Sequence, residues 1–280
     1  MLLVFNEIQL ILAIFKEKME SLNGKVVWIT GASSGIGEGL VYALTQKNCK
    51  LILSGRNVAE LNRVKSNCNG IAEILPFDLA DFNNAKEYVA QAIAFFEKVD
   101  LLVLNGGISQ RSLILATDLN VDKKLIEIDY LGNVALAKAI LPHFIQHKYG
   151  HFAVVTSLMG KFVSPYRSGY CGAKHALHGF FDVMRMEHQK DGIKVTIICP
   201  GFIQTNVAKN ALTADGSKQV IDDEATKNGM PVIVFAKKFI KAIEAEKFEA
   251  YIGGKETLGV LLKRFFPKLL HYSVLRSKVR

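Results

Sequence analysis

Short runs rich in β-branched residues alternate with longer stretches of helical periodicity from Gly24 onward. This alternation is typical of repeated βαβ units, in which helices join parallel strands. The expected strands are 25–30, 50–54, 72–77, 101–105, 152–157, 194–199 and 249–252, and the expected helices lie near 37–47, 81–97, 122–147, 170–190 and 232–246. Several strands are apolar on both faces, as strands between two layers of helices are. We therefore predict an α/β fold, a single-domain doubly wound Rossmann fold with a seven-stranded parallel sheet flanked by helices.

A glycine-rich segment, TGASSGIG from Thr30 to Gly37, stands between the first expected strand and the first expected helix. Glycines let a backbone turn tightly and approach a pyrophosphate, which the N–H groups of the helix N-terminus then bind. A tight turn without a ligand is the other interpretation, but the position at the first strand-to-helix junction favours a dinucleotide site. The expected cofactor contacts in this loop are Gly31, Ser33, Ser34, Gly35, Ile36 and Gly37.

The second expected strand ends in Ser54-Gly55-Arg56. It lacks the Asp or Glu that would bind the ribose 2′-hydroxyl of NAD. The guanidinium of Arg56 suits the 2′-phosphate of NADP instead. A surface charge before a helix is the alternative. We expect NADP(H) as the cofactor.

Three polar residues indicate where a proton could be transferred. Tyr170 and Lys174 lie four residues apart on an expected helix, so their side chains emerge from one face. An ammonium group beside a phenol stabilises the phenolate, which makes Tyr170 a candidate proton donor to a carbonyl. Such a pair also occurs by chance on ordinary helices. Ser157 makes the pattern more specific, because it ends the fifth strand at the edge where open α/β sheets bind ligands.

In order and spacing these residues resemble the short-chain dehydrogenase/reductase family. The resemblance covers about residues 23–254 and rests on TGASSGIG at Thr30 to Gly37, Ser157, YCGAK at Tyr170 to Lys174 and PGFIQT at Pro200 to Thr205. Within that family, the chain is most similar to the dehydrogenase/reductase family member 7 group in NGGISQRSL from Asn105, DYLGN from Asp129 and GYCGAKHALHGFF from Gly169.

The resemblance implies hydride transfer between NADP(H) and a carbonyl or secondary alcohol. It implies that Ser157 hydrogen-bonds the substrate oxygen, that Tyr170 transfers the proton and that Lys174 holds the nicotinamide ribose. Tyr170 and Lys174 therefore also count as cofactor contacts, and Ser157 and Tyr170 as substrate contacts. The other expected cofactor contacts are Asp78 and Leu79 at the adenine, Asn105 and Gly107 at the ribose region, and Pro200, Gly201, Ile203 and Thr205 near the nicotinamide. Helices around Asp122 and Tyr170 pair in many members, which implies a homodimer.

Two positions depart from the family's pattern. Leu104-Asn105-Gly106-Gly107 stands where Asn-Asn-Ala-Gly is usual and keeps the second Asn. The Asn that completes the family's catalytic set falls on Asp129. A carboxylate cannot donate a hydrogen bond as an amide does, and it brings a negative charge. We keep Asp129 as the fourth candidate catalytic residue, with Asn133, one helical turn on, as a candidate substitute.

The positive charge is concentrated at one end of the chain. The 280 residues hold 35 Lys+Arg and 26 Asp+Glu, a formal +9, of which seven basic residues and one acid in 255–280 supply +6. Because the body has no basic stripe, no nucleic-acid partner is expected. The four cysteines form no Cys-x-x-Cys pair and no metal-ligand spacing occurs, so we expect free buried thiols and no metal site.

Both ends of the chain are apolar, but no run of 18 apolar residues could span a bilayer. Residues 1–22 are interpreted as an apolar arm, either an interfacial helix or a packed segment. In the tail, residues 255–280, apolar and basic side chains alternate, and Pro267 should interrupt any helix. Such a tail suits the headgroup region of an anionic membrane, whereas packing on its own domain or a dimer contact is the alternative. With the resemblance, this predicts monotopic association with the endoplasmic reticulum membrane; a cytoplasmic location is the alternative.

We therefore expect residues 23–254 to form an NADP-binding catalytic domain. The polar connection 206–229 is too long for an ordinary loop and is the expected substrate loop. The expected substrate is a lipophilic carbonyl or alcohol such as a steroid, retinoid or xenobiotic. Two alternatives stay open: a 3-ketoacyl or 3-ketosphinganine reductase, which would use the same residues, and a catalytically silent NADP-binding protein, which Asp129 motivates.

Overall fold

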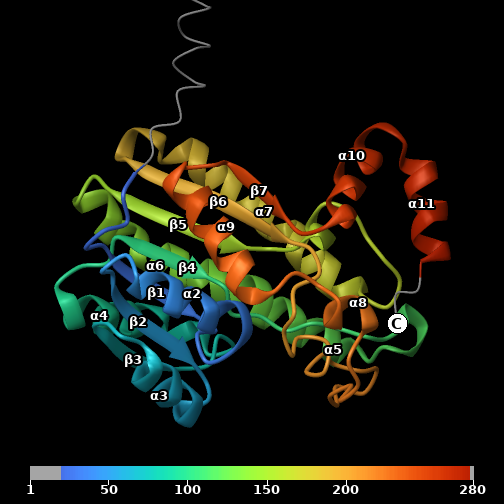
Figure 1. Cartoon of the computed structure of the whole chain (residues 1–280), viewed down its shortest axis with the longest axis horizontal. Coiled ribbons are helices and arrows are strands. Elements are labelled where there is room, and N and C mark those ends of the chain that lie inside the picture. Colours follow the sequence, from blue (N-terminus) through green and yellow to red (C-terminus); the bar gives the residue numbers. More distant parts are fainter. Residues whose placement is uncertain (1–19, 278–280) are drawn as a thin grey trace, which may run out of the picture.

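Seven parallel strands form one sheet at the centre of the protein (Figure 1), in a computed structural model that describes residues 20–277. The strand order is β3-β2-β1-β4-β5-β6-β7. The strands are β1 (Val26–Thr30), β2 (Lys50–Gly55), β3 (Ala72–Pro76), β4 (Leu101–Leu104), β5 (Gly150–Val155), β6 (Ile193–Pro200) and β7 (Glu249–Ile252). All seven expected strands are present, with ends shifted by at most two residues. The predicted fold class is confirmed.

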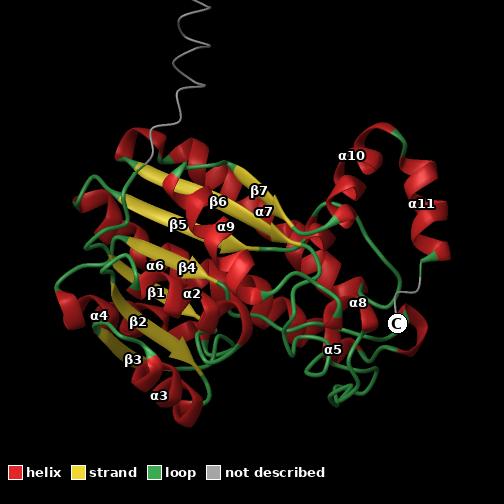
Figure 2. Cartoon of the chain, viewed as in Figure 1, coloured by secondary structure: helices red, strands yellow, loops and turns green. Residues whose placement is uncertain are grey.

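Helices cover both faces of the sheet (Figure 2). Alternate residues of β1 point to opposite faces: Val27 and Ile29 pack into one buried cluster, and Val26 and Trp28 into the other. The first cluster is completed by α2 (Gly35–Thr45), α3 (Val58–Asn67) and α9 (Val232–Glu244). The second is completed by α4 (Ala85–Phe96), α6 (Asn133–Gln146) and α7 (Ser168–Glu187). Two apolar layers explain why the strand sequences are apolar on both faces.

The strand order determines at which edge of the sheet a ligand can bind. β1 lies between β2 and β4, so the chain winds outward in one direction up to β3 and in the other direction from β4. At this switch the connections diverge and leave a crevice at the carboxyl ends of the strands, where open α/β sheets bind ligands. Thr30, Ser54 and Asn105 lie at or directly after those ends.

Helix α3 was not among the expected helices. Of its ten residues only Leu61 and Val64 are buried, so the sequence has little apolar periodicity. A capping signal was nevertheless present, because the Asn57 side chain accepts a hydrogen bond from the Glu60 amide at 3.1 Å. Asn followed three residues later by Glu is a sequence mark of a helix N-terminus.

The long helix expected over 122–147 contains an irregular turn. It consists of α5 (Leu119–Ile126), a π-helical segment η3 (Glu127–Gly132) and α6. Asp129 and Gly132 both lie in η3, and a Cβ on Gly132 would lie 2.4 Å from the Leu79 carbonyl oxygen. Because π segments frequently occur at functional sites, this irregularity points to the same region as the motifs do.

The basic tail folds into two helices that stand away from the sheet (Figure 1). These are α10 (Leu258–Phe265) and α11 (Pro267–Arg276). Pro267 occupies the first turn of α11, so the predicted interruption of the helix is confirmed. No helix between residues 20 and 277 is long and apolar enough to cross a membrane.

Residues 20–22, the end of the predicted apolar arm, pack on the domain. The Glu20 amide donates to the Glu244 carbonyl oxygen at 2.7 Å, and its carboxylate pairs with Lys194 at 2.6 Å. Leu22 is buried. The rest of the arm, 1–19, lies outside the described residues. The four cysteines are free and buried, as expected.

Candidate active site

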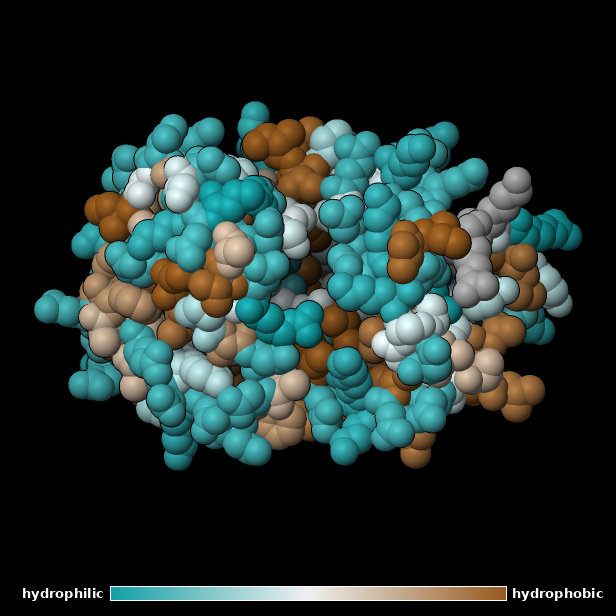
Figure 3. All heavy atoms as spheres, turned by 90° about the horizontal axis from the view of Figure 1, so that it is seen from below, coloured by the Kyte–Doolittle hydropathy of each residue, from teal (hydrophilic) through white to brown (hydrophobic). Residues whose placement is uncertain are grey.

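A cavity of about 1010 Å³ lies at the carboxyl edge of the sheet. Its wall includes residues that follow β1, β2, β4, β5 and β6, together with part of loop 206–229 and of α10 and α11. In Figure 3 the face seen from below is hollowed near its middle, and apolar side chains lie inside the opening. The cavity thus occupies the position that the strand order predicts for a ligand.

The glycine loop has a shape that side chains would not allow. Gly31 and Gly35 have φ angles of +65° and +56°, in the left-handed region that favours glycine. A Cβ on Gly31 would lie 2.9 Å from the Gly106 Cα, and one on Gly37 only 2.1 Å from the Gly31 carbonyl oxygen. The expected loop residues that line the cavity are Gly31, Ser33, Ser34, Gly35 and Ile36. Gly37 does not line the cavity; instead it packs closely against the Gly31 backbone.

Thr30 and Asn105 fix this loop against the segment after β4. The Thr30 hydroxyl accepts from the amides of Asn105 and Gly106 at 3.0 and 2.9 Å. The Asn105 side-chain amide donates to the carbonyl oxygens of Thr30 and Gly31 at 3.0 and 3.2 Å. Asn105, Gly106 and Gly107 line the cavity. Asn105 therefore shapes the cofactor loop from behind in addition to bordering the cavity.

Arg56 lies on the cavity wall with its side chain 61% exposed. Its Nη1 atom is 3.8 Å from an oxygen of Asp78, which is also exposed. Asp78 and Leu79 also line the cavity, and their contact with an adenine stays a prediction. The guanidinium therefore has solvent-facing donors available for an anionic group.

Ser157 directly follows β5 and precedes the short helix η4 (Leu158–Gly160). Its Oγ accepts a hydrogen bond from the Met159 amide at 3.1 Å. This contact fixes the side chain as the cap of η4 and leaves the hydroxyl hydrogen free to donate. Ser157 lines the cavity together with Tyr170 and Lys174.

Tyr170 and Lys174 come from the first two turns of α7. Lys174 is buried, and its Nζ lies 5.6 Å from the centre of the Tyr170 ring. Nζ also donates to the Val155 carbonyl oxygen at 3.3 Å. The ammonium thus lies between the tyrosine ring and the end of β5.

Asp129 is fully buried behind Lys174 and does not line the cavity. One carboxylate oxygen accepts from the Ile108 amide at 2.7 Å. The other lies 3.7 Å from Lys174 Nζ and has no hydrogen-bond partner. Burial raises the pKa of Asp129, and the Lys174 charge opposes that rise. Asp129 therefore acts on the site through its charge and its contact with Lys174, and not by lining the cavity.

Asn133 does not take the place of the missing amide. Its side-chain nitrogen donates to the Asp129 carbonyl oxygen at 2.9 Å and is within 3.3 Å of the Ile128 carbonyl oxygen. Asn133 is buried and is not on the cavity wall. The Asn133 amide therefore hydrogen-bonds carbonyl groups of the π segment and not a group in the cavity, so the structure gives no support to Asn133 as a substitute for the catalytic Asn.

The remaining expected contacts follow β6. Pro200, Gly201, Ile203 and Thr205 all line the cavity. The Thr205 side chain approaches the glycine loop, since a Cβ on Gly35 would lie 3.2 Å from its methyl group. These positions agree with the expectations, but the assigned contacts stay predictions.

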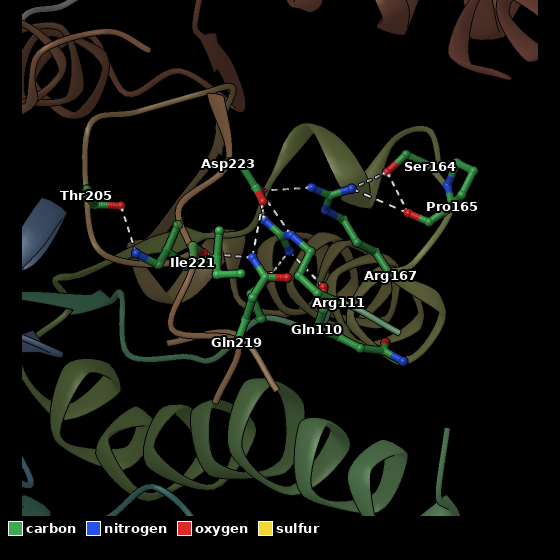
Figure 4. A network of polar contacts seen from close by, with 11 residues as sticks. Gln110, Arg111, Ser164, Pro165, Arg167, Thr205, Gln219, Ile221 and Asp223 are labelled. Atoms are coloured by element: carbon green, nitrogen blue, oxygen red, sulfur yellow. Dashed lines mark hydrogen bonds and ion pairs between the residues drawn. The ribbon is translucent and has the colours of Figure 1, made fainter. Parts of the chain in front are cut away.

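Two parts of the cavity wall carry no sequence-based expectation. One consists of Arg111 and Arg167, which belong to a buried polar network with Gln110 and Asp223, two residues that do not line the cavity (Figure 4). Burial and the nearby Arg111 charge lower the pKa of Arg167 to about 10, although Asp223 opposes this. The other part comes from the tail: Leu258, Leu262, Leu270 and Val274. The sequence segment NGGISQRSL includes Gln110 and Arg111, but the sequence alone assigned no role to either residue.

The wall fits a dinucleotide with a nicotinamide ring. Gly31 and Gly35, which have no side chains, lie on the cavity wall at the start of α2, and a pyrophosphate binds at such a helix N-terminus. Ser157, Tyr170 and Lys174 lie on the same cavity. Fold and site together define a nicotinamide-dependent oxidoreductase.

Comparisons with known proteins agree. The family model described as short chain dehydrogenase matches residues 25–216. A protein of Drosophila melanogaster, dehydrogenase/reductase SDR family protein 7-like, is 35% identical over 267 residues, 92% of this chain and 82% of that protein. Human dehydrogenase/reductase SDR family member 7 is 45% identical over 207 residues, 71% of this chain and 61% of that protein. A short chain dehydrogenase/reductase from Burkholderia phymatum, solved in complex with NAD, has a TM-score of 0.79 at 19% identity, covering 90% of this chain and 96% of that one.

The chain therefore belongs to the short-chain dehydrogenase/reductase family, whose members are oxidoreductases acting on CH–OH groups with NAD(P). Its relatives carry the names of the member 7 group, which confirms the closer resemblance found in the sequence.

Proposed function

We propose that this protein transfers hydride between NADP(H) and a carbonyl or secondary alcohol of a lipophilic substrate at a membrane surface. One observation carries the proposal. A single cavity is lined by the glycine loop and Arg56, by Ser157, Tyr170 and Lys174, and by apolar residues of the tail.

The cofactor, when bound, supplies or accepts the hydride, and the protein's residues manage the substrate oxygen and its proton. Ser157 donates its free hydroxyl hydrogen to that oxygen, because Oγ already accepts from Met159. Tyr170 gives its proton to the same oxygen during carbonyl reduction and accepts one during alcohol oxidation. The Lys174 ammonium favours the phenolate that remains. The buried Asp129 carboxylate, 3.7 Å from Lys174, weakens that effect when ionised.

Arg56 supports NADP(H) as the preferred cofactor. The residue before it is Gly55, so no carboxylate ends β2, and the guanidinium is exposed on the cavity wall. Guanidinium groups bind phosphate through charge-assisted hydrogen bonds. The Burkholderia neighbour was solved with NAD, but its 19% identity bears on the fold alone.

The tail supports a lipophilic substrate. Leu258, Leu262, Leu270 and Val274 contribute to the cavity, and Phe162 and Leu212 lie on the same wall. Such a pocket binds a largely apolar ligand, and the few polar groups near Ser157 orient its carbonyl.

The outer side of the same tail supports attachment to a membrane. Six large side chains of the α10–α11 pair are more than half exposed and do not line the cavity: Leu261, Phe265, Phe266, Leu269, Tyr272 and Leu275. Exposed basic residues accompany them: Lys263, Arg264, Lys268 and Arg276. In Figure 3 apolar residues gather at the right-hand end, where Figure 1 shows α10 and α11. Apolar insertion and attraction to anionic headgroups add at such a surface.

We assign the endoplasmic reticulum membrane as the location, with monotopic attachment, because the resemblance implies it. A homodimer through α5 and α7 is part of the same proposal. The large exposed side chains Val183 and Met186 on α7 support a contact on that helix.

The test is oxidation of NADPH and NADH by the purified full chain against a broad panel of carbonyl compounds, with and without detergent. The proposal requires turnover that is faster with NADPH and that favours apolar ketones over small polar ones. Cofactor binding without turnover of any carbonyl would instead indicate a catalytically silent NADP-binding protein.

A further inference from the structure

We infer that Asp223 is a positioning residue: through Arg111 and Arg167 it ties loop 206–229 to the first turn of α7 and so holds Tyr170 in place for proton transfer. This inference rests on the proposed function, because it concerns the proton donor of that reaction. Figure 4 shows the network that carries it.

Asp223 is a buried carboxylate between two buried guanidinium groups. It lies in loop 206–229 directly before the short helix α8 (Glu224–Lys227), and its side chain is 3% exposed. One carboxylate oxygen accepts from Arg111 Nε at 3.0 Å and Nη2 at 2.5 Å, and from Arg167 Nη2 at 3.4 Å. The other oxygen accepts from the Gln219 side chain at 3.3 Å. Both oxygens are therefore used, and the charge is compensated where water is excluded.

Main-chain contacts reinforce the same connection. The Arg111 amide donates to the Leu212 carbonyl oxygen at 2.8 Å, and the Leu212 amide donates to the Ser109 carbonyl oxygen at 2.8 Å. On its other side, the Ser112 amide donates to the Tyr166 carbonyl oxygen at 3.1 Å. The segment after β4 thus lies between the substrate loop and the start of α7.

The link from this segment to Tyr170 is direct. The Gln110 side-chain oxygen accepts from the amides of Gly169 and Tyr170 at 2.9 and 3.3 Å. These amides belong to the first turn of α7, where helix N–H groups lack partners within the helix. Arg167 directly precedes that turn, and its Nη1 donates to the Ser164 hydroxyl at 3.0 Å. Ser109, Arg111, Arg167 and Tyr170 all line the cavity.

The consequence is that the substrate loop and the catalytic tyrosine are held by one group of contacts. Loss of the Asp223 charge leaves Arg111 and Arg167 facing each other without the carboxylate between them. Arg167 and the first turn of α7 then shift relative to Ser157. Displacements of about an ångström at a catalytic group can lower turnover roughly a hundredfold.

The experiment compares Asp223→Asn with Asp223→Glu and with the neighbouring Asp222→Asn. Asp222 is on the same loop, and its ion-pair contact is to Lys209 of that loop at 3.7 Å. We expect Asp223→Asn to lower kcat by about tenfold to a hundredfold, to raise the KM for the carbonyl and to raise the isotope effect with 4-deuterated NADPH. Asp223→Glu should recover part of the loss. Asp222→Asn should match the wild type, and NADPH affinity should be unchanged in all three.

These readouts separate positioning from general damage. A residue that only stabilises the fold would lower the folded fraction and leave the isotope effect unchanged. Wild-type kcat and KM in a folded Asp223→Asn would overturn the inference, as would an unchanged isotope effect.

Amide hydrogen exchange gives a test that does not need turnover or a stable variant. In the wild type, the amides of Leu212 and Tyr170 should exchange at similar rates, because they open as one unit. Rates about tenfold or more apart would refute the coupling. A wild type that turns over no carbonyl would refute the proposed function, and hydrogen exchange would still decide whether loop and helix are coupled.

Discussion

Replacing Asp129 by Asn restores the amide of the family's pattern and removes one buried negative charge. In this structure the carboxylate contacts Lys174 at 3.7 Å, and Lys174 Nζ lies 5.6 Å from the centre of the Tyr170 ring. Above the raised pKa of Asp129, the carboxylate is ionised and disfavours the Tyr170 phenolate. Asp129→Asn should therefore move the pH midpoint of alcohol oxidation toward neutral.

The size of this shift follows from the same distances. The path through Lys174 Nζ places the carboxylate within about 9 Å of the Tyr170 ring centre. At that distance and an effective dielectric constant near 20, two unit charges interact by roughly 2 kcal/mol. One pH unit corresponds to about 1.4 kcal/mol, so we expect the midpoint to fall by about 1 to 1.5 units.

The assay is the pH dependence of kcat for oxidation of a secondary alcohol by NADP. Glu127→Gln is the matched control, since Glu127 lies in the same π segment but is partly exposed and pairs with Lys123 at 3.8 Å. It should leave the midpoint unchanged. A midpoint for Asp129→Asn within about 0.3 units of the wild type, well below the shift expected from the charge, would refute the reasoning.

Stability gives a second measure of the same charge. Because the pKa of Asp129 is raised on folding, the stability it contributes is complete below the unfolded value, near 3.9. That stability is lost as the pH rises through the folded value. Asn does not titrate, so the Tm of Asp129→Asn relative to the wild type should increase with pH.

Three further predictions concern the cofactor, the glycine loop and the tail. Arg56→Ala should weaken NADPH binding about tenfold and leave NADH binding unchanged; the effect is at the lower end for a charge-assisted hydrogen bond because Arg56 is exposed. Titration with both cofactors checks this, with Arg63→Ala as the control. An equal loss of NADH affinity would contradict it. Gly37→Ala should destabilise the fold by about 1 to 3 kcal/mol, because the added Cβ would clash with Gly31. Gly179→Ala on α7 should stabilise the fold by about 0.5 to 1 kcal/mol, because a Cβ there has no neighbouring atom within 4 Å. Urea unfolding measures both changes. The triple variant Phe265→Ser, Phe266→Ser and Leu269→Ser should reduce sedimentation with anionic vesicles at least about tenfold, since each inserted side chain contributes on the order of 1 kcal/mol or more. Ile71→Ser, at an exposed apolar position elsewhere, should have no such effect, and an equal loss would argue against a docking role for the tail.

The sequence predicted the sheet well because each strand carries its own signal. The five inner strands β1, β2, β4, β5 and β6 are mostly apolar, as burial on both faces requires. The edge strands β3 and β7 each contain a glutamate, yet both were short enough and apolar enough to be predicted. Helix α3 carried no comparable signal, since only Leu61 and Val64 are buried in it. The interruption of the long helix by η3 could not be predicted either, because its cause is tertiary: Gly132 packs against the Leu79 backbone.

The sequence predicted those site residues that belong to a recognisable motif. Ser157, Tyr170 and Lys174 are on the cavity wall as expected. The Asp223 network was not predictable, because Arg111, Arg167 and Asp223 are far apart in the sequence and meet only when loop 206–229 folds over the site. The tail's contribution to the cavity was likewise not predictable from the sequence. Its apolar residues fit a membrane surface in the sequence, yet Leu262, Leu270 and Val274 face the pocket.

The central claim is that Tyr170 transfers the proton in an NADP-dependent carbonyl reduction. The most direct measurement is single-turnover oxidation of bound NADPH by a carbonyl substrate in the wild type and in Tyr170→Phe, with NADPH affinity determined in parallel. Tyr42→Phe, whose hydroxyl donates to Glu38 at 2.9 Å on helix α2, is the control for loss of a hydroxyl. General acid catalysis contributes about a hundredfold to ten-thousandfold, so Tyr170→Phe should lose at least that much in rate while NADPH binding stays the same. A Tyr170→Phe rate within about tenfold of the wild type, well short of that range, would contradict the account.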